Sequence, residues 1–355
     1  MHRFNESVEV TMKALYYEKA GRENAKITDI PYPQCKAGHV IVKVVSSGIC
    51  IGVETGHDNK GTSLSIYPVV PGHEFSGTVH EIGENVTCLK VGDRVTVDNS
   101  VPCGHCYYCK RCQPLWCQNF GSLGHNINGG MAEFAMVDAN KVYLIPDHVS
   151  FNSAAMAEPV ACCIHGLDQL NIRYGDEVLV LGAGAQGMIM AQLVKHSNAS
   201  KFAVIGSTKS KLDVLNGLAI DTILMDRNDY SIHEKKVFDM FPNGVDCIID
   251  TTGASELVSE SSKLMKMGGR VLGYGYYHEP NAKLTFPFST FWEKECIYYS
   301  SFAQTGDYDR AIDAIASGKV NTEQLITHEY QLDDYFEALD YNAKSSDAVK
   351  IIIHP

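Results

Sequence analysis

The stretch EVLVLGAGAQGMIMAQLV, residues 177–194, decides the fold. An apolar strand-like run leads into the glycine-rich turn GAGAQG, and an apolar helix-like segment follows it. A G-x-G-x-x-G motif occurs by chance in many loops, but this strand–turn–helix context is what a dinucleotide site requires. Gly182 permits the tight turn, Gly184 lets a pyrophosphate approach the backbone, and Gly187 lets helix and strand pack closely. Because the helix start also offers N–H groups to the anion, we predict a dinucleotide-binding turn here.

The rest of the chain after residue 150 alternates between helical and strand-like patterns. The predicted strands beyond 177–181 lie at 202–205, 222–225, 247–249 and 270–273. This alternation predicts βαβ units and a parallel sheet covered on both faces. Before residue 150, short β-rich runs are separated by Gly, Pro and Asn, which is typical of a twisted, barrel-like β region.

The end of the second strand of the βαβ region bears on the choice of cofactor. An NAD site usually has an acidic residue there, which accepts hydrogen bonds from the adenine ribose. The run AVIGSTKSK at 203–211 has no carboxylate, and its hydroxyl and lysine side chains would receive a 2′-phosphate. We therefore expect NADP(H) to be favoured over NAD(H), although the lysines also fit the solvated start of a helix. The cofactor-binding residues expected in this run are Gly206, Ser207, Thr208 and Lys211.

Five of the twelve cysteines crowd into residues 103–117. Without a secretory signal, such crowding predicts metal ligation before disulfides. Four thiolates spaced three, three and eight residues apart can close around a tetrahedral Zn²⁺ that stabilises a loop and has no open position for catalysis. A redox dithiol and a nucleic-acid-binding zinc ribbon are the alternatives. The predicted ligands are Cys103, Cys106, Cys109 and Cys117, with Cys112 left over.

Length and charge limit the classes of function. With 355 residues, 45% of them hydrophobic, the chain can bury two domain cores. It has 30 basic and 42 acidic residues, a formal charge of −12, which argues against a nucleic-acid or anionic-lipid partner. The first ten residues lack an apolar core, and the longest apolar stretch, 178–185, is far shorter than a membrane span. We expect a cytoplasmic protein with no membrane partner.

Four further residues could form a second metal site. Cys50 ends the run GIC, His73 and Glu74 lie in PGHEF, and Glu158 lies in AEP. A thiolate, an imidazole and carboxylates are all zinc ligands, although each residue taken alone is more often an ordinary core or surface residue.

These motifs together resemble those of the zinc-dependent medium-chain dehydrogenase/reductase superfamily, which includes the alcohol and polyol dehydrogenases. The resemblance runs from Met12 to Pro355. It implies a GroES-like β-rich catalytic domain at 1–165 with a structural zinc lobe at 100–120, and a Rossmann domain with a doubly wound parallel sheet at 166–300. Residues 301–355 would return to the catalytic domain. The motifs are GIC (48–50), PGHEFSGTVHEIG (71–83), VGDRV (91–95), the four-cysteine lobe, NGGMAEFAMV (128–137), AEP (157–159) and GAGAQG (182–187).

The resemblance implies that Cys50, His73, Glu74 and Glu158 surround a catalytic zinc. Glu158 falls where alcohol dehydrogenases of the family have a third ligand and polyol dehydrogenases have a glutamate. Alcohol dehydrogenase has a Cys₂His catalytic zinc site, so a glutamate in place of its second cysteine favours the polyol branch. Whether Glu74 or Glu158 contacts the metal is left open at this point.

One position departs from the family pattern. Members of the family commonly have Ser or Thr two residues after the ligand cysteine, as part of a proton relay, but this chain has Gly52. Thr55, His57 or a water molecule is then the candidate relay, and His57 is equally consistent with an ordinary surface residue.

The resemblance implies an oxidoreductase that interconverts a sugar alcohol or secondary alcohol and its ketose or ketone by hydride transfer to and from NADP(H). Arabitol-type substrates come first, by analogy with the family. A threonine-type amino-alcohol dehydrogenase and a catalytically idle NADPH-binding protein are the alternatives. The family also implies a homodimer or homotetramer.

Overall fold

The computed structural model describes residues 10–276 and 282–355, and the chain divides into two compact units. Unit 1 contains the chain up to residue 158 together with 328–343 and 351–355. Unit 2 contains 159–327 and 344–350. The return to the first unit therefore begins later than the boundary expected at 301. Hydrogen bonds such as Asn321 N to Gln192 Oε1, at 2.8 Å, tie this later segment to unit 2.

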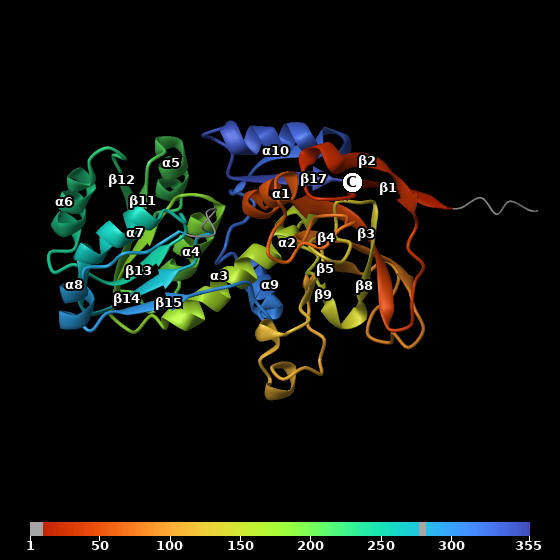
Figure 1. The fold of residues 1–355 in the computed structure, drawn as a ribbon, viewed down its shortest axis with the longest axis horizontal. Coiled ribbons are helices and arrows are strands. Elements are labelled where there is room, and N and C mark those ends of the chain that lie inside the picture. The colour runs from red at the N-terminus through yellow and green to blue at the C-terminus, as the bar shows by residue number, and fades with distance from the viewer. Residues whose placement is uncertain (1–9, 277–281) are drawn as a thin grey trace, which may run out of the picture. The chain divides into compact units, whose positions relative to one another are not determined.

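Unit 1 is built around an antiparallel sheet in the order β16-β17-β3-β4-β5-β9, with β8 paired to β3 (Figure 1). Along β3, Val40, Val42 and Val44 alternate onto the buried face, as the two-residue period of a strand requires. Phe75 and Val95 from β4 and β5 join the same core. The sheet strands are β3 (His39–Gly48), β4 (Phe75–Ile82), β5 (Arg94–Val97), β8 (Phe134–Asp138), β9 (Val142–Leu144), β16 (Ile326–Gln331) and β17 (Lys350–His354).

Smaller elements complete unit 1. The pairs β1–β2 and β6–β7 are separate two-stranded sheets. The strands are β1 (Thr11–Tyr17), β2 (Ala25–Pro31), β6 (Ser100–Val101) and β7 (Gly121–Ser122). The helices are α1 (Ile51–Asp58), α2 (Phe151–Ala155) and α10 (Tyr335–Lys344), and α3 (Ala157–Leu170) begins in this unit and continues into unit 2.

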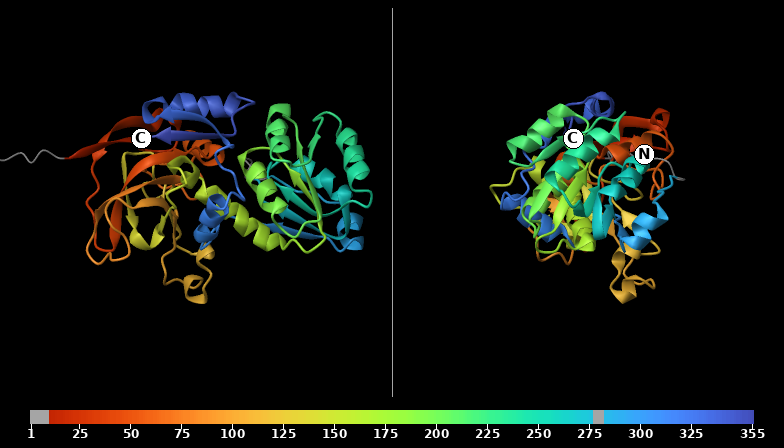
Figure 2. Two further views of the ribbon diagram at one scale, coloured as in Figure 1. Left: turned by 180° about the vertical axis from the view of Figure 1, so that it is seen from behind. Right: turned by 90° about the vertical axis from the view of Figure 1, so that its left-hand side faces the viewer.

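Unit 2 is a six-stranded parallel sheet in the order β12-β11-β10-β13-β14-β15. Helices α4 and α5 cover one face, and α6 and α7 cover the other (Figures 1 and 2). The chain reverses its direction of strand addition at β10, the switch point where such sheets bind nucleotides. The strands are β10 (Glu177–Leu181), β11 (Lys201–Gly206), β12 (Thr222–Leu224), β13 (Val245–Asp250), β14 (Met265–Gly273) and β15 (Ile297–Ser300). The helices are α4 (Ala185–Lys195), α5 (Lys209–Gly217), α6 (Tyr230–Met240), α7 (Ser255–Ser261), α8 (Phe288–Glu293) and α9 (Tyr308–Ala316).

The burial of β10 explains its continuous run of apolar residues, from which the strand was predicted. Val178 to Leu181 are fully buried, because helices cover the sheet on both sides. The predicted fold class, a β-rich domain with a doubly wound parallel-sheet domain, is confirmed. Among the described residues, the helices are all too short or too polar to cross a bilayer.

Candidate active site

Cys50, His73 and Glu74 come together because β3 and β4 are antiparallel neighbours. Ser47 of β3 pairs with Phe75 of β4, and Gly48 N donates to Glu74 O at 2.7 Å. The chain leaving β3 and the chain entering β4 therefore lie side by side. One donor atom from each of the three residues lies within 4.8 Å of the other two.

The donor set fits a zinc ion. A cysteine sulfur, a histidine nitrogen and a carboxylate oxygen are three zinc ligand types, and three protein ligands with one further position are typical of a catalytic zinc. His73 Nε2 lies 3.9 Å from Glu74 Oε1, which is too far for a hydrogen bond between them. His73 is 3% exposed and Glu74 is fully buried. Burial of a carboxylate beside an imidazole costs free energy unless a cation or a hydrogen bond compensates.

Glu54 is a site residue that the sequence analysis missed. Its Oε1 lies 4.0 Å from His73 Nδ1, whereas the other ring nitrogen, Nε2, faces Glu74. Its Oε2 accepts a hydrogen bond from Cys50 N at 3.1 Å. Cys50 is the N-cap of α1 and Glu54 lies four residues later, on the same side of the first turn. That spacing was available from the sequence, but only with a helix predicted at 51–58.

Glu158 lies outside the group formed by Cys50, His73 and Glu74. It sits in the first turn of α3 and is 7% exposed. The structure thus brings Glu74, and not Glu158, together with the cysteine and histidine. The physical reason is that Glu74 follows His73 directly at the start of β4, whereas Glu158 comes from a separate helix.

The two candidate relay residues have other hydrogen-bond partners. The Thr55 hydroxyl donates to Ile51 O within α1. His57 is fully buried, with Nε2 3.0 Å from Gly124 O and Nδ1 2.8 Å from Tyr67 Oη. Since a carbonyl only accepts, Nε2 carries the proton and Nδ1 accepts from the tyrosine. His57 is therefore not an ordinary surface residue, and burial lowers its pKa.

His125 is a second neighbour that the sequence did not reveal. Its ring centroid lies 5.0 Å from that of His73 and 6.2 Å from that of His57. Burial, with smaller contributions from these two rings, lowers its pKa to about 3, so the imidazole is neutral near pH 7. A neutral ring packs against His73 without adding a positive charge beside the candidate metal ligands.

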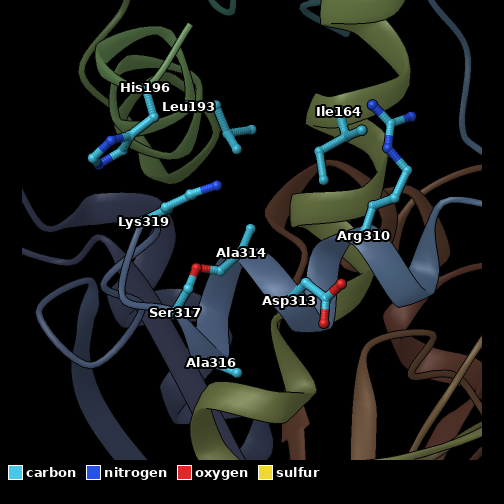
Figure 3. Close-up of a pocket in the computed structure, with 9 residues that line it drawn as sticks. All are labelled: Ile164, Leu193, His196, Arg310, Asp313, Ala314, Ala316, Ser317 and Lys319. Carbon is cyan, nitrogen blue, oxygen red and sulfur yellow. The ribbon is translucent and has the colours of Figure 1, made fainter.

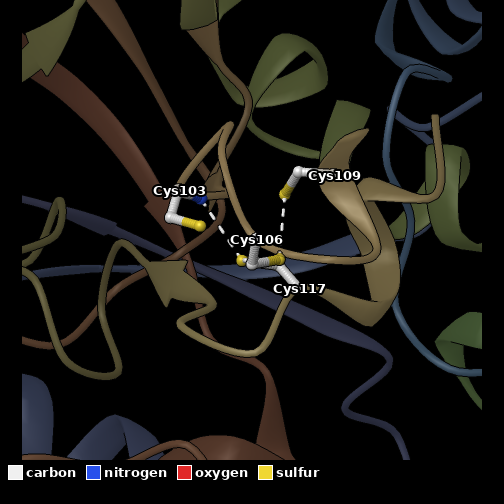
Figure 4. Close-up of side chains that lie close together, drawn as sticks. All are labelled: Cys103, Cys106, Cys109 and Cys117. Carbon is white, nitrogen blue, oxygen red and sulfur yellow. Dashed lines mark hydrogen bonds between the residues drawn. The ribbon is translucent and has the colours of Figure 1, made fainter. Parts of the chain in front are cut away.

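The four lobe cysteines gather as the spacing predicted, with their sulfur atoms facing one another (Figure 4). Each sulfur lies within 4.8 Å of the other three. Cys112 is exposed and lies outside this group, at a left-handed backbone position with φ 57°. The lobe is separate from the Cys50 group.

Backbone N–H groups point at the lobe sulfurs. Cys103 N and Asn119 N donate to Cys117 Sγ at 3.3 and 3.4 Å. The N–H groups of Cys109 and Gln118 lower the pKa of Cys106 to about 6. Because N–H donors favour the thiolate over the thiol, the loop is suited to holding a metal cation.

The glycine-rich turn has little room for side chains at two of its three glycines. Gly182 has φ +108°, a conformation that favours glycine. A Cβ added at Gly187 would lie 2.0 Å from Gly182 O, so α4 passes too close to the turn for any side chain. At Gly184, the N-cap of α4, an added Cβ would meet nothing within 4 Å. The backbone there is open to a ligand, which fits the close approach of a pyrophosphate.

The residues at and just after the end of β11 differ in how buried they are and in what they contact. A Cβ at Gly206 would lie 2.8 Å from a Leu212 methyl group and 2.9 Å from Ala183 Cβ, so this glycine serves packing against the turn. Lys209 pairs with Asp213 one helical turn away and is solvent-exposed. Lys211 is half-buried, and burial lowers its pKa.

Arg227 is the third residue missed by the sequence analysis. Its Nε and Nη2 donate to Ser207 Oγ at 3.0 and 2.7 Å. Arg227 follows β12, the strand beside β11, and so reaches the end of β11 from a segment twenty residues further along the chain. Only the pairing of the two strands reveals this contact.

A hollow of about 670 Å³ lies elsewhere in unit 2 (Figure 3). It is lined by residues of α3, α4 and α9, among them Ile164, Leu193 and Arg310. The Arg310 guanidinium is occupied by Asp168 and Asp307. None of the predicted site residues lines this hollow.

Comparisons with known proteins agree with this arrangement. Residues 36–147 match the alcohol dehydrogenase GroES-like domain, and residues 185–317 match the zinc-binding dehydrogenase domain. A D-arabinitol dehydrogenase of Uromyces fabae is 34% identical over 346 residues, which cover 97% of each chain. The chain belongs to the zinc-dependent medium-chain dehydrogenase/reductase family. The resemblance drawn from its motifs is thereby confirmed.

Other similar proteins differ in the substrate for which they are named and in the cofactor that they hold. A D-arabitol-phosphate dehydrogenase of Enterococcus avium is 32% identical, with 97% of each chain covered. A zinc-binding dehydrogenase structure from Sinorhizobium meliloti, bound to NADP, superposes with a TM-score of 0.90 at 28% identity, covering 98% of this chain and 100% of that one. An alcohol dehydrogenase from E. coli CFT073, complexed with NADH, gives 0.87 at 27%, covering 97% and 99%. These two structures hold different cofactors, so membership of the family is compatible with either NAD(H) or NADP(H).

Proposed function

We propose that this dehydrogenase interconverts a sugar alcohol or other secondary alcohol and its ketose or ketone, by hydride transfer to and from NADP(H), at a zinc held by Cys50, His73 and Glu74. The observation that carries the proposal is the set of one sulfur, one nitrogen and one oxygen within 4.8 Å of one another, in which His73 and Glu74 are buried and Cys50 is partly exposed. A zinc ion bound there would act as a Lewis acid that polarises the substrate oxygen and lowers the pKa of an alcohol.

The chain's own residues would prepare this site in three ways. Pairing of β3 with β4 fixes the positions of Cys50 and of His73 with Glu74. Glu54 faces Nδ1 of His73, while Nε2 faces Glu74, and a carboxylate at the second ring nitrogen is the arrangement that orients a metal-binding imidazole. Glu158, in α3, is proposed to contribute a carboxylate near the substrate or the metal, as the family resemblance implies.

Thr55 and His57 are the two side chains predicted to relay the proton of the substrate hydroxyl. Both side chains are engaged in hydrogen bonds, that of Thr55 inside its own helix. Of the two, His57 is the better candidate, because the Thr55 hydroxyl is engaged with Ile51 O inside its own helix.

The preference for NADP(H) is supported by the residues after β11. No carboxylate occurs between Gly206 and Lys211, and Ser207, Thr208 and Lys211 would face a 2′-phosphate with hydroxyl and ammonium groups. The turn at Gly182, Gly184 and Gly187 would receive the pyrophosphate at the start of α4.

The substrate class is proposed from the relatives and the carboxylates. Curated relatives are named for D-arabinitol, D-arabitol phosphate and sorbitol. Polar carboxylates beside the metal suit a polyhydroxylated substrate better than a long apolar alcohol. We place arabitol first among polyols.

The four-cysteine lobe is proposed to hold a second, structural zinc at Cys103, Cys106, Cys109 and Cys117. Four protein ligands leave no open position, so this ion would stabilise the lobe without taking part in the reaction. None of the twelve cysteines is paired in a disulfide, which favours a reducing compartment such as the cytoplasm.

A homodimer or homotetramer is proposed from the family. The edge strand β15 and the nearby α8 carry the exposed apolar side chains Ile297, Phe288 and Trp292, which a second copy would cover. Sedimentation equilibrium of the purified protein tests this assembly.

The decisive experiment is a substrate panel assayed with both cofactors, alongside zinc analysis. We expect two zinc ions per chain and oxidation of arabitol, xylitol or sorbitol with NADP⁺ preferred. Oxidation of threonine without polyol activity would overturn the substrate class. A single zinc ion, lost from the Cys109→Ser variant, together with no turnover, would favour the idle NADPH-binding protein.

A further inference from the structure

The loop after β12 reaches across to the end of β11. Gly206 is the register partner of Leu224, and Met225 N donates to Gly206 O at 2.9 Å. Ser207 follows Gly206 directly, and Arg227 lies two residues after Met225. The Arg227 guanidinium donates from Nε and Nη2 to the Ser207 hydroxyl, which holds the cation at the carboxyl end of the parallel sheet.

In the part of the chain that the structure describes, no carboxylate pairs with Arg227. Over residues 10–276 and 282–355, no salt bridge to this guanidinium is found, whereas Arg310 and Arg270 each bind an aspartate. Arginine has five N–H donors, and Ser207 takes up two of them. In a chain with a formal charge of −12, an exposed cation without a carboxylate partner is available to an anion.

Lys209, two residues after Ser207 in the sequence, provides the contrast. Its ammonium group pairs with Asp213 at 2.9 Å, and its side chain is 77% exposed. Lys209 is therefore a solvated, already neutralised cation, whereas Arg227 is held by a hydroxyl that would itself hydrogen-bond to an anion.

We propose that Arg227, oriented by Ser207, binds the 2′-phosphate of NADP(H) and determines the cofactor preference of this enzyme. The proposal rests on the NADP(H) preference proposed above and adds the residue responsible for it. Guanidinium N–H groups match phosphate oxygens with charge and with geometry, and the sheet's switch point brings the adenine ribose to the ends of β10 and β11.

Binding titrations test the proposal without turnover. The apo enzyme is titrated by calorimetry with NADPH, NADH, 2′,5′-ADP and 5′-AMP. For Arg227→Ala we expect affinity for NADPH and 2′,5′-ADP to fall about 10- to 100-fold, the scale of lost charge-assisted hydrogen bonds. Affinity for NADH and 5′-AMP should stay within about twofold, since neither carries the 2′-phosphate.

Three further variants separate charge, geometry and position. Arg227→Lys keeps the charge without the planar fork and should give an intermediate loss. Ser207→Ala removes the hydroxyl that orients the guanidinium and should weaken binding of NADPH and 2′,5′-ADP by a smaller factor, without changing that of NADH or 5′-AMP. Lys209→Ala removes an exposed charge nearby and should leave all four affinities unchanged.

Two results would overturn the proposal while leaving the proposed function intact. One is a wild-type enzyme that prefers NADPH but an Arg227→Ala variant with unchanged NADPH affinity. The other is an equal loss of NADPH and NADH, which would assign Arg227 to the adenine or to loop structure. A wild-type enzyme that binds NADH more tightly than NADPH would instead overturn the cofactor choice itself, and this inference with it.

Discussion

Glu54 and His73 face each other, with Glu54 Oε1 4.0 Å from His73 Nδ1, while the other carboxylate oxygen of Glu54 accepts from the backbone of Cys50. One side chain therefore touches two of the three residues that we propose as zinc ligands. We expect Glu54→Gln to weaken zinc affinity about 10- to 100-fold, the usual cost of removing such a partner. Competition with a chromophoric chelator measures this change.

The control for Glu54→Gln is Glu84→Gln, which removes one negative charge at an exposed loop position. It should leave zinc affinity unchanged. Equal affinities in wild type and Glu54→Gln would show that His73 needs no carboxylate to orient it.

The lobe cysteines allow a matched comparison. Cys109→Ser should remove one zinc ion per chain and lower the melting temperature, because a three-ligand site no longer closes the loop. Cys112→Ser, whose sulfur lies outside the group, should keep full zinc content. Zinc analysis and calorimetry measure both variants, and a folded Cys109→Ser enzyme with no activity would contradict a purely structural role.

Thr208→Asp places a carboxylate at the end of β11. Repulsion of a 2′-phosphate should lower NADP⁺ affinity about tenfold or more and move the ratio of kcat/KM values toward NAD⁺. Asn216→Asp adds the same charge near the far end of α5 and serves as the control. Unchanged cofactor preference in Thr208→Asp would mean that the 2′-phosphate does not lie near this residue.

His57→Gln tests whether the buried histidine moves protons or supports structure. Loss of a hydrogen bond to Tyr67 or to Gly124 O should cost about 1–3 kcal/mol of stability. If the role is structural, the pH profile of kcat keeps its shape in the folded enzyme, and this is the result we expect. A shifted or flattened profile would assign His57 to the relay.

Acid stability should depend on the same residue. Burial lowers the pKa of His57 below its ordinary value of 6.5, so the unfolded chain binds a proton that the folded protein excludes. The stabilising effect of the neutral ring is complete above pH 6.5 and is lost as the pH falls through the folded-state pKa. Denaturant titrations at pH 7.5 and 5.5 should show a smaller stability difference for His57→Gln than for wild type. An identical difference would argue against this contribution.

The glycine-rich turn and the cysteine lobe could be predicted from short stretches of sequence, whereas the Cys50 and His73 group could not. The turn at 182–187 is local: strand, glycines and helix follow one another, so its geometry could be predicted from one stretch. The cysteine lobe is local as well. The grouping of Cys50 with His73 depended on the family motifs, because only the pairing of β3 with β4 brings them together.

The residues that were missed depend on contacts that no short pattern contains. Arg227 reaches Ser207 because β11 and β12 are neighbours, and His125 reaches His73 through an irregular loop. Glu54 was hidden because Gly52 and Gly56 weaken the expected helix signal at 51–58. For the same reason the internal bond of Thr55 to Ile51 could not be foreseen.

The crowding at Gly187 limits how this enzyme can change over evolution. A single methyl group there would collide with Gly182 O, so the phosphate turn tolerates almost no variation. Ser207 and Arg227, by contrast, lie at the accessible rim of the same sheet. Descendants of this enzyme that switch coenzyme should therefore carry their substitutions at the rim and inherit the glycines unaltered.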